Sequence, residues 1–236
     1  VNWTNGNGAS RLVLARSGSV VNSNPVNGTS YTANAAFGSG TQVGTGNYVV
    51  YSGTGSSVNL TGLTAGTTYH FQVYEFNGSG ATSLFMTSTA TGNPASQSTL
   101  FAVPTTQATA IVFSSVTPTA MTVSWTKGNG TSRVVIARSG SAVNSSPVNG
   151  TTYTANAAFG TGTQLGTGNY VIYSGTGATV NVTGLTAGTT YHLQIFEYNG
   201  TGATSSFMTS TATGNPASQT TPAIAPTTQA TNVTFP

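Results

Sequence analysis

The sequence predicts an all-β protein built from two tandem β-sandwiches. Three observations support this prediction. The chain repeats itself at a fixed spacing, apolar residues alternate with polar ones over short runs, and clusters of Gly, Asn and Thr separate those runs. Because no segment carries a 3.6-residue apolar period of useful length, helices are not expected.

The repeat has a period of 122 residues. Trp3 matches Trp125, and 125 − 3 = 122; YTANAAFG at 31–38 recurs at 153–160 with the same offset. The matching segments align without a gap, and most of their positions are identical. A repeat of this length predicts two domains of about 100–120 residues each.

The boundary between the repeats is expected near Thr99–Pro104, in STLFAVPTTQ, because Pro and Thr without charge suit a short extended linker. We expect repeat 1 over 1–100 without its first strand, and a complete repeat 2 over 101–222. Residues 223–236 are expected to be the first strand of a following repeat. The chain is therefore interpreted as a circularly shifted window on a periodic array.

Strand patterns follow one another in repeat 2. AMTVSWT (120–126) alternates apolar and polar residues, and RVVIAR (133–138) is a β-branched run. NYVIYSGTGATVNVTGL (169–185) predicts two strands joined by a Gly-rich turn. TYHLQIFEYN (190–199) alternates again, and SFMTSTAT (206–213) is a further strand candidate. Short strands with Gly-rich turns are typical of a sandwich.

The motifs resemble the fibronectin type III module, which has a core Trp on strand B, here in VSWT, and a Leu-x-x-x-x-x-Tyr signature at the E–F turn. The resemblance implies two tandem Ig-like, fibronectin type III β-sandwiches with a long insert after strand C. The insert is similar to one in repeats of bacterial secreted and cell-surface proteins, which use such modules as spacers, adhesive stalks and fibre units. The structural core residues it implies are Trp3, Trp125, Leu63, Tyr69, Leu185 and Tyr191.

The insert, Ser139–Gly168 in repeat 2, is long for a loop without structure. We expect it to pack Tyr153 and Phe159 against the edge of the sandwich. The Tyr191 hydroxyl is expected to form a hydrogen bond with the backbone near the preceding turn, as in a tyrosine corner.

The composition excludes several classes of partner. Charged residues make up only 3% of the chain, so a neutral hydroxyl- and amide-rich surface is expected, which favours association. Five scattered Lys and Arg residues do not form a phosphate-binding stripe, and there is no Cys for disulfides or thiol chemistry. No apolar run reaches the length of about 18 residues that a membrane span needs. We expect no nucleic-acid partner, no membrane insertion and no cofactor.

Groups capable of catalysis are scarce. His70 and Glu75, like His192 and Glu197, stand at an odd spacing on a predicted strand, so each pair points to opposite faces and forms neither a dyad nor a metal site. GTGTQLGTG at 160–168 lacks the following helix and Lys of a phosphate loop, and no Ser lies in a GxSxG motif. The sequence predicts neither an enzyme nor a metal site.

Glu197 continues the inward phase of its strand, so its carboxylate needs a partner. Strands C and F are antiparallel neighbours in the fibronectin type III fold, which puts the end of F near the start of C. The expected structural ion pairs are Glu197–Arg133 and Glu75–Arg11, with Arg138 and Arg16 as alternative partners.

Two surface features leave a carbohydrate role open. Aromatic residues expected to face outward could stack on surface glycans or cover a neighbouring loop or module; they are Tyr74, Phe76, Phe196 and Tyr198. Asn-x-Ser/Thr sequons are candidate glycosylation sites, although Asn-Gly is also a common turn pair. They include Asn27, Asn59, Asn77, Asn149, Asn181 and Asn199.

The end of the chain repeats the segment that introduces repeat 2. PTTQATNVTF at 226–235 matches PTTQATAIVF at 104–113, and no such segment precedes Trp3 in the printed sequence. A sandwich without its first strand exposes a sheet edge, where another strand can add. The predicted assembly strand consists of Thr228, Gln229, Ala230, Thr231, Asn232, Val233, Thr234 and Phe235.

Two accounts of this strand stay open: it completes the next copy head to tail, or the same junction forms within a longer tandem chain. The first functional hypothesis is a structural repeat unit of an extracellular bacterial fibre or stalk, whose partners are copies of itself. The alternative is a pair of adhesive or carbohydrate-binding modules of a secreted or surface protein. Both hypotheses place the protein outside the cell or on its surface.

Overall fold

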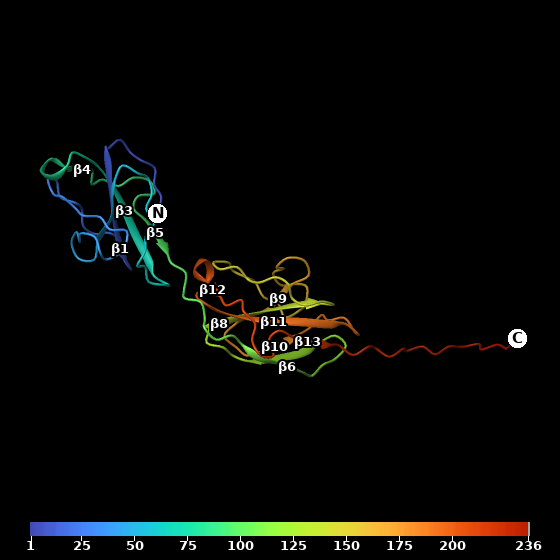
Figure 1. Ribbon diagram of the computed structural model, residues 1–236. Helices are drawn as coiled ribbons and strands as arrows, with labels where there is room; N and C mark the ends of the chain where they lie inside the picture. Colours follow the sequence, from blue (N-terminus) through green and yellow to red (C-terminus); the bar gives the residue numbers. More distant parts are fainter. Residues whose placement is uncertain (236) are drawn as a thin grey trace. The chain divides into compact units, whose positions relative to one another are not determined.

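A computed structural model of the chain describes residues 1–235 (Figure 1). It divides into two compact units, the first over Val1–Phe101 and the second from Ala102 onward, so the boundary falls inside the expected linker. The described part of each unit consists of antiparallel strands, loops and one short 3₁₀ turn, and the predicted all-β class is confirmed. Below, the counterpart of a residue is the one 122 positions away in the other repeat.

The second unit contains two sheets that face one another. A three-stranded sheet has the order β10-β7-β6, and the other has the order β12-β11-β8-β9 with β13 also paired to β11. Strands β8 and β11 are the antiparallel neighbours expected of strands C and F. The elements are β6 (Thr109–Ser114), β7 (Met121–Thr126), β8 (Ser132–Ser139), β9 (Tyr170–Gly175), β10 (Thr179–Val182), β11 (Thr190–Asn199), η2 (Gly202–Thr204), β12 (Ser206–Phe207) and β13 (Ala217–Thr220).

The core between these two sheets is built by the alternation seen in the sequence. Trp125 on β7 is 6% exposed and packs with Tyr191, Leu193 and Ile195 of β11. The Tyr191 hydroxyl accepts a hydrogen bond from the backbone N–H of Thr186 at 2.8 Å, so the backbone is the donor in this tyrosine corner. Burial of these large side chains is the main favourable term in folding.

The insert covers the outer face of the second sheet, which differs from the expected packing against the edge. Tyr153 lies edge-on to Phe207 in an outer cluster that includes the fully buried Phe196. Phe159 instead reaches the inner core and lies 4.9 Å from Tyr191 between ring centroids. Strand β8 is therefore buried on both faces, as its continuous apolar run in the sequence allows.

The first unit repeats the second sheet and the insert but has only a remnant of the three-stranded sheet. The order β2-β1-β3-β4 is kept, with β5 paired to β3. Asn2 and Ser57 form a single bridge where β7 and β10 pair in the second unit. The elements are β1 (Ser10–Ser17), β2 (Tyr48–Gly53), β3 (Thr68–Asn77), η1 (Gly80–Thr82), β4 (Leu84–Phe85) and β5 (Ala95–Ser98).

Candidate functional site

A groove runs along the first unit where the second unit carries β6. It holds about 1100 Å³ and is lined by the first residues of the chain, by one face of β3 and by the loop that precedes β5. Phe71, Val73 and Glu75 form the β3 side of the groove. Val73 is only partly buried, whereas its counterpart Ile195 is fully buried. The groove is thus the uncovered inner face of an incomplete sandwich.

In the second unit, residues 105–114 fill the equivalent space, and Gln107 anchors them. The Gln107 Nε2 donates to the carbonyl oxygens of Met208 and Ser210 at 2.9 and 3.0 Å. Its Oε1 accepts from the backbone N–H groups of Glu197 and Ala108 at 2.9 and 3.0 Å. Without the amide, the buried N–H groups of Glu197 and Ala108 would be left unpaired, which makes Gln107 costly to replace.

Backbone hydrogen bonds hold the rest of this segment in place. Ala110 and Ile111 donate to the carbonyl oxygens of Thr213 and Gly214, each at 3.0 Å. Ala110 has φ of +51°, a left-handed conformation that is unfavourable for Ala. A Cβ on Gly214 would lie 3.1 Å from the Ala110 Cα, so the glycine permits this close approach.

The first unit keeps the residues that hold this segment. In the second unit, four carbonyl oxygens accept hydrogen bonds from this segment. The counterparts of these four residues all line the groove; they are Met86, Ser88, Thr91 and Gly92. Asn93 also lines it. Its counterpart Asn215 donates Nδ2 to the carbonyl oxygens of both Ala108 and Ile195 at 2.9 Å, and is 1% exposed.

Asn93 makes only the contact that corresponds to Asn215–Ile195. Its Nδ2 donates to the carbonyl oxygen of Val73 at 2.7 Å, and its Oδ1 accepts from the Val73 N–H at 3.0 Å. A side-chain amide nitrogen has two hydrogens to donate, so the groove offers one more donor for a strand lying in it.

The predicted assembly strand matches this binding pattern position by position. Gln229 corresponds to Gln107, Ala230 to the fully buried Ala108, and Val233 to the buried Ile111. Asn232 replaces Ala110 and has φ of +57°, which Asn adopts more readily than Ala. The tail therefore has the anchoring amide, the small and apolar side chains and the backbone preference that the groove requires.

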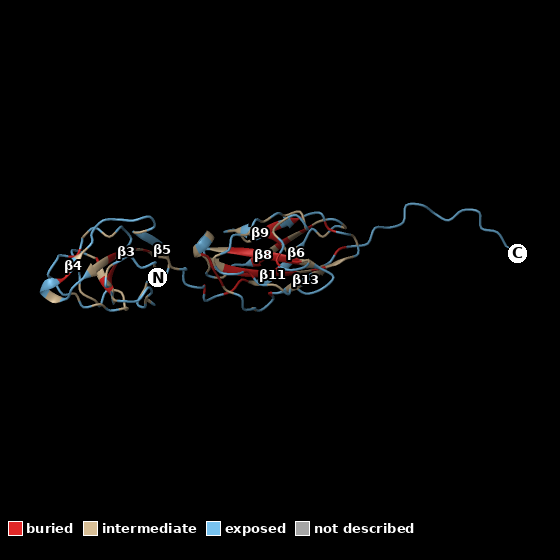
Figure 2. Cartoon of the chain, turned by 90° about the horizontal axis from the view of Figure 1, so that it is seen from above, coloured by how far each residue is buried: buried red, intermediate tan, exposed pale blue. Residues whose placement is uncertain are grey.

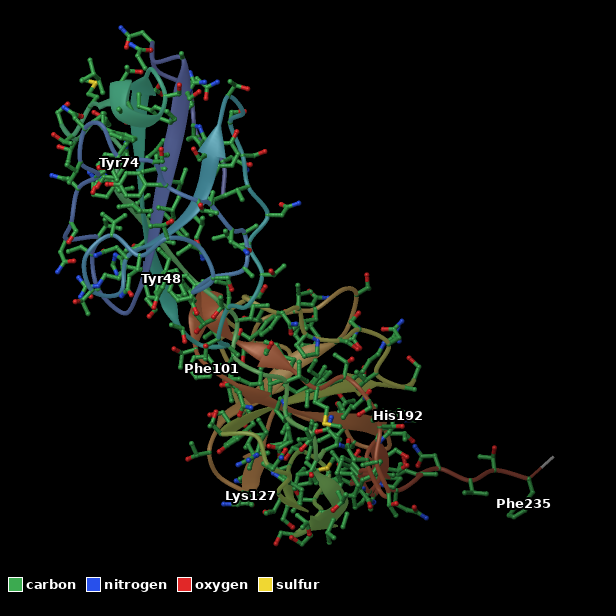
Figure 3. The ribbon with its side chains drawn as sticks, turned by 60° about the vertical axis from the view of Figure 1, so that its left-hand side comes forward. Tyr48, Tyr74, Phe101, Lys127, His192 and Phe235 are labelled. Carbon is green, nitrogen blue, oxygen red and sulfur yellow. The ribbon has the colours of Figure 1, made fainter. Side chains whose placement is uncertain are left out.

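In the described chain the tail itself is uncovered. Every residue from Pro222 to Phe235 is exposed, and Phe235 is 88% exposed (Figures 2 and 3). Thr227 and Thr228 nevertheless form the same bend as Thr105 and Thr106. No strand is assigned over 222–235, so the assembly strand stays a prediction.

Each unit has one Glu–Arg pair next to the groove or to the segment that fills the equivalent space. The pairs are the expected Glu75–Arg11 and Glu197–Arg133. Arg133 donates Nε and Nη2 to the two carboxylate oxygens of Glu197 at 2.9 and 2.8 Å, and Arg11 Nε lies 3.1 Å from Glu75 Oε1. The alternative partners Arg16 and Arg138 instead donate to backbone carbonyls.

The GNG loop before each pair supplies further donors, which the sequence analysis did not anticipate. Gly128 N–H donates to Glu197 Oε1 at 2.9 Å, and Gly6 and Gly8 donate to the two oxygens of Glu75 at 2.6 and 3.0 Å. A Cβ on Gly130 would lie 2.6 Å from Glu197 Oε2, so the close approach requires glycine. The identical GNG in both repeats was the sequence feature that could have indicated these glycine N–H donors.

The remaining predicted core residues lie as the resemblance implies. Trp3 and Leu63 pack against the inner cluster of the first unit, where Tyr69 is 2% exposed and accepts a hydrogen bond from Thr64 N–H at 2.9 Å. Leu185 is 5% exposed in the second unit. The indole N–H groups of Trp3 and Trp125 have no partner among the described residues.

Two of the four aromatic residues expected to be exposed on the outer sheet face are instead covered. Tyr74 and Phe196 are both fully buried, because the insert packs over the outer sheet face. Burial raises the pKa of the Tyr74 hydroxyl to about 12. Phe76 and Tyr198 stay partly exposed. The prediction of an outward aromatic platform was therefore wrong for the two residues nearest the middle of the sheet.

The sequons differ in how available their side chains are. Asn27, Asn77, Asn149 and Asn199 each use Oδ1 to accept a backbone N–H, as turn residues do. Asn59 and Asn181 are the sequons of the β10 region, and both are exposed. If sugar is attached to any of the six, these two positions leave the fold undisturbed.

The described residues offer no site for metal or acid–base chemistry. No group of three or more His, Cys, Asp or Glu side chains lies close enough to hold a metal ion. His70 pairs in register with Arg16, and His192 with Arg138, away from the buried carboxylates. Among the described helices, none is long and apolar enough to cross a membrane.

The sequence profile of the purple acid phosphatase N-terminal domain matches residues 106–212, which lie within the second unit. No curated protein sequence matches the chain. The strand orders agree with the fibronectin type III resemblance that the sequence motifs carry. The matched profile describes the N-terminal domain of purple acid phosphatase and not its catalytic domain.

Solved structures with fibronectin type III domains match at low identity. A two-domain segment of chicken tenascin is 14% identical, with 91% of this chain and 84% of that chain covered and a TM-score of 0.29. The chicken CNTN1 FN1–FN3 domains are 13% identical, covering 91% and 57%, with a TM-score of 0.38. A redesigned β-sandwich protein is 15% identical, covering 52% and 96%, with a TM-score of 0.33.

Proposed function

We propose that this chain is a structural repeat unit of an extracellular bacterial fibre or stalk, assembled head to tail by strand completion. The observation that carries the proposal is the groove of the first unit together with the tail. The groove keeps the residues that hold 105–114 in the second unit, and residues 227–235 repeat that segment. A tail that docks in the groove of another copy completes its sandwich.

The geometry of such a contact favours a linear array. The tail belongs to one unit and the groove to the other, so the contact is heterologous and leaves a free tail and a free groove at opposite ends. A heterologous contact that does not close into a ring builds an open fibre. Strand addition at an exposed sheet edge supplies main-chain hydrogen bonds, and buried side chains set the register.

Gln229 is the residue expected to fix this register. Its counterpart Gln107 satisfies two carbonyl oxygens and two N–H groups in a pocket where it is 4% exposed. In the first unit, the equivalent carbonyl oxygens belong to Met86 and Ser88. A strand shifted by one residue would put a Thr or an Ala there, which cannot replace the amide.

The experiment compares the full chain with one that lacks residues 226–236, using sedimentation velocity and negative-stain electron microscopy over a range of concentrations. The full chain should form linear oligomers, and the truncated chain should stay monomeric with both units folded. Polymerisation of the truncated chain, or a full chain that stays monomeric at every concentration, would refute strand completion between copies.

A matched pair of point variants sharpens this test. Gln229→Leu should weaken assembly by at least about tenfold, because groups in the groove lose their partners. Thr228→Ala should leave assembly unchanged, since its counterpart Thr106 contributes only its backbone groups, to Asn129. Equal behaviour of the two variants would contradict the proposed register.

A second candidate function is an adhesive or carbohydrate-binding module. The observation in its favour is a shallow hollow of about 210 Å³ on the second unit, whose lining includes Tyr153, Tyr198 and Ser174. Exposed aromatic and hydroxyl groups suit a sugar ring. Binding on a glycan array that is lost in Tyr198→Ala would support this role, and an array without hits would refute it.

A further inference from the structure

The two copies of the lead-in segment differ where they enter the sandwich. PTTQAT is identical at 104–109 and 226–231, so the part with the anchoring Gln is the same. The four residues before it are not: LFAV at 100–103 stands against PAIA at 222–225. They also differ further along, where AIV at 110–112 stands against NVT at 232–234. The difference at the entry concerns the surface that the segment meets before it reaches the groove.

In the second unit, the entry of the lead-in covers one corner of the sheet. The Asn199 Nδ2 donates to the carbonyl oxygen of Ala102 at 2.9 Å. Asn199 pairs in register with Ser206 of β12, and Ser206 is only 2% exposed. Asn199 therefore links the backbone of the lead-in at Ala102 to the strand pair that contains Ser206, and both of these residues are small.

The same corner of the first unit has a large apolar residue instead. Leu84 is the counterpart of Ser206 and pairs with Asn77 in the same register, but it is 62% exposed. In the tail, the counterpart of Ala102 is Ile224, which is 65% exposed. The two positions therefore carry small residues in the second unit, Ala102 and Ser206. They carry large aliphatic residues in the tail and the first unit, Ile224 and Leu84.

We infer that Ile224 of one copy packs on Leu84 of the next and seals the junction between copies. This inference rests on the proposed head-to-tail assembly. A junction between separate molecules loses translational and rotational freedom, whereas the lead-in of the second unit is tethered to its sandwich. The junction between copies therefore needs affinity that the internal one does not, and burying two aliphatic side chains provides it.

The test uses natural residues from the internal corner as substitutions, so neither is expected to disturb the fold. The acceptor is the chain ending at Thr221, and the probe is a fluorescent peptide of residues 222–236, measured by fluorescence anisotropy. Leu84→Ser in the acceptor and Ile224→Ala in the peptide should each raise Kd by about tenfold or more. Combined, they should be little worse than either alone, because both remove one contact.

Three further measurements decide between outcomes. Val20→Ser, at an exposed valine of the insert, should leave Kd unchanged. A peptide of residues 100–114 should bind the unaltered acceptor more weakly than the tail peptide, and the Leu84→Ser acceptor should bind the two peptides more evenly. If the tail peptide binds but the two substitutions have no effect or independent effects, the Ile224–Leu84 contact is refuted alone. If the tail peptide does not bind at all, the proposed assembly is refuted with it.

Discussion

The two units have nearly the same sequence and differ in one segment. Residues 105–114 cover the inner sheet face of the second unit, and the first unit has no counterpart in the printed chain. The Glu197 side chain is accordingly 0% exposed and the Glu75 side chain 16%. The same residues thus form a sealed core in one unit and the wall of a groove in the other.

The difference is confined to the inner face. On the outer face, under the insert, Leu14 and Tyr74 of the first unit are as fully buried as Ile136 and Phe196 of the second. The insert therefore gives each unit a core that does not depend on β6. This explains how the first unit can keep its sheet while its groove stays open.

The largest expected difference between the units concerns the buried carboxylates. Glu197→Gln should lower the free energy of unfolding of the second unit by about 3–5 kcal/mol, because Arg133 is left buried without a counter-charge. Glu75→Gln should cost less, since water reaches that pair. Urea unfolding followed by tryptophan fluorescence measures each unit separately: Trp3→Phe leaves Trp125 as the reporter, and Trp125→Phe leaves Trp3. Equal losses in the free energy of unfolding of the two units would contradict the expected difference between the sealed and the open inner face.

The insert offers a contrast in which the two units should behave alike. Asn47 and Asn169 are both fully buried, and each donates Nδ2 to the side-chain oxygen of an Asn earlier in the insert. Asn47→Ala and Asn169→Ala should each cost about 1–3 kcal/mol in their own unit. The exposed Asn59 serves as the control, for which Asn59→Ala should have little effect. Unequal costs, measured in the same single-tryptophan backgrounds, would mean that the insert core does depend on β6.

Tyr74 should make the first unit alone sensitive to alkaline pH. Its pKa of about 12 in the folded unit lies above the value of about 10 in an unfolded chain, so the neutral hydroxyl favours the folded state. The contribution is complete below pH 10 and is lost as the pH rises toward 12, by about 1 kcal/mol at pH 11. Urea unfolding of the first unit at pH 9 and pH 11 measures it. Tyr74→Phe, which installs the residue of the second unit, should remove this component; an unchanged loss in that variant would exclude Tyr74 as its source.

Salt should have the smallest effect. The chain has only 5 Lys and Arg and 2 Glu residues, and the two Glu are paired within their units. The junction proposed between copies depends on an amide, backbone hydrogen bonds and aliphatic side chains. Oligomer size by sedimentation should therefore change little between about 0.01 and 1 M salt. A steep decrease in assembly with salt would point to charged contacts beyond the Glu75–Arg11 pair at the groove.

Much of the fold could be predicted from local patterns. The alternation in TYHLQIFEYN placed Tyr191, Leu193 and Ile195 in the inner core. The same phase turned Glu197 inward, and its pairing with Arg133 followed from the family resemblance, in which strands C and F are antiparallel neighbours. The position of the insert could not be predicted, because Gly-rich segments without periodicity carry no signal for the face on which they pack. Phe196 was assigned to the surface for that reason, since a covered outer face looks like an exposed one in the strand pattern.

The anchoring role of Gln107 was also invisible in the sequence, although its segment was recognised. A single Gln among Thr and Ala residues has no pattern that separates a buried amide from a solvated one. Its role depends on carbonyl oxygens of Met208 and Ser210, which lie more than 100 positions away. The identical TTQAT in the two lead-ins was the signal that could have drawn attention to it.

By itself, the sequence determined the repeat of 122 residues and the strands, because side-chain alternation and self-similarity can be read along the chain. Only the tertiary structure decided which surfaces are covered. It placed the insert over the outer face, left the groove of the first unit open, and gave the Gln107 amide and the Glu197 carboxylate their buried hydrogen-bond partners. Burial depends on what lies across a gap, and partners distant in sequence provide it. The same residues are therefore core in one unit and groove in the other.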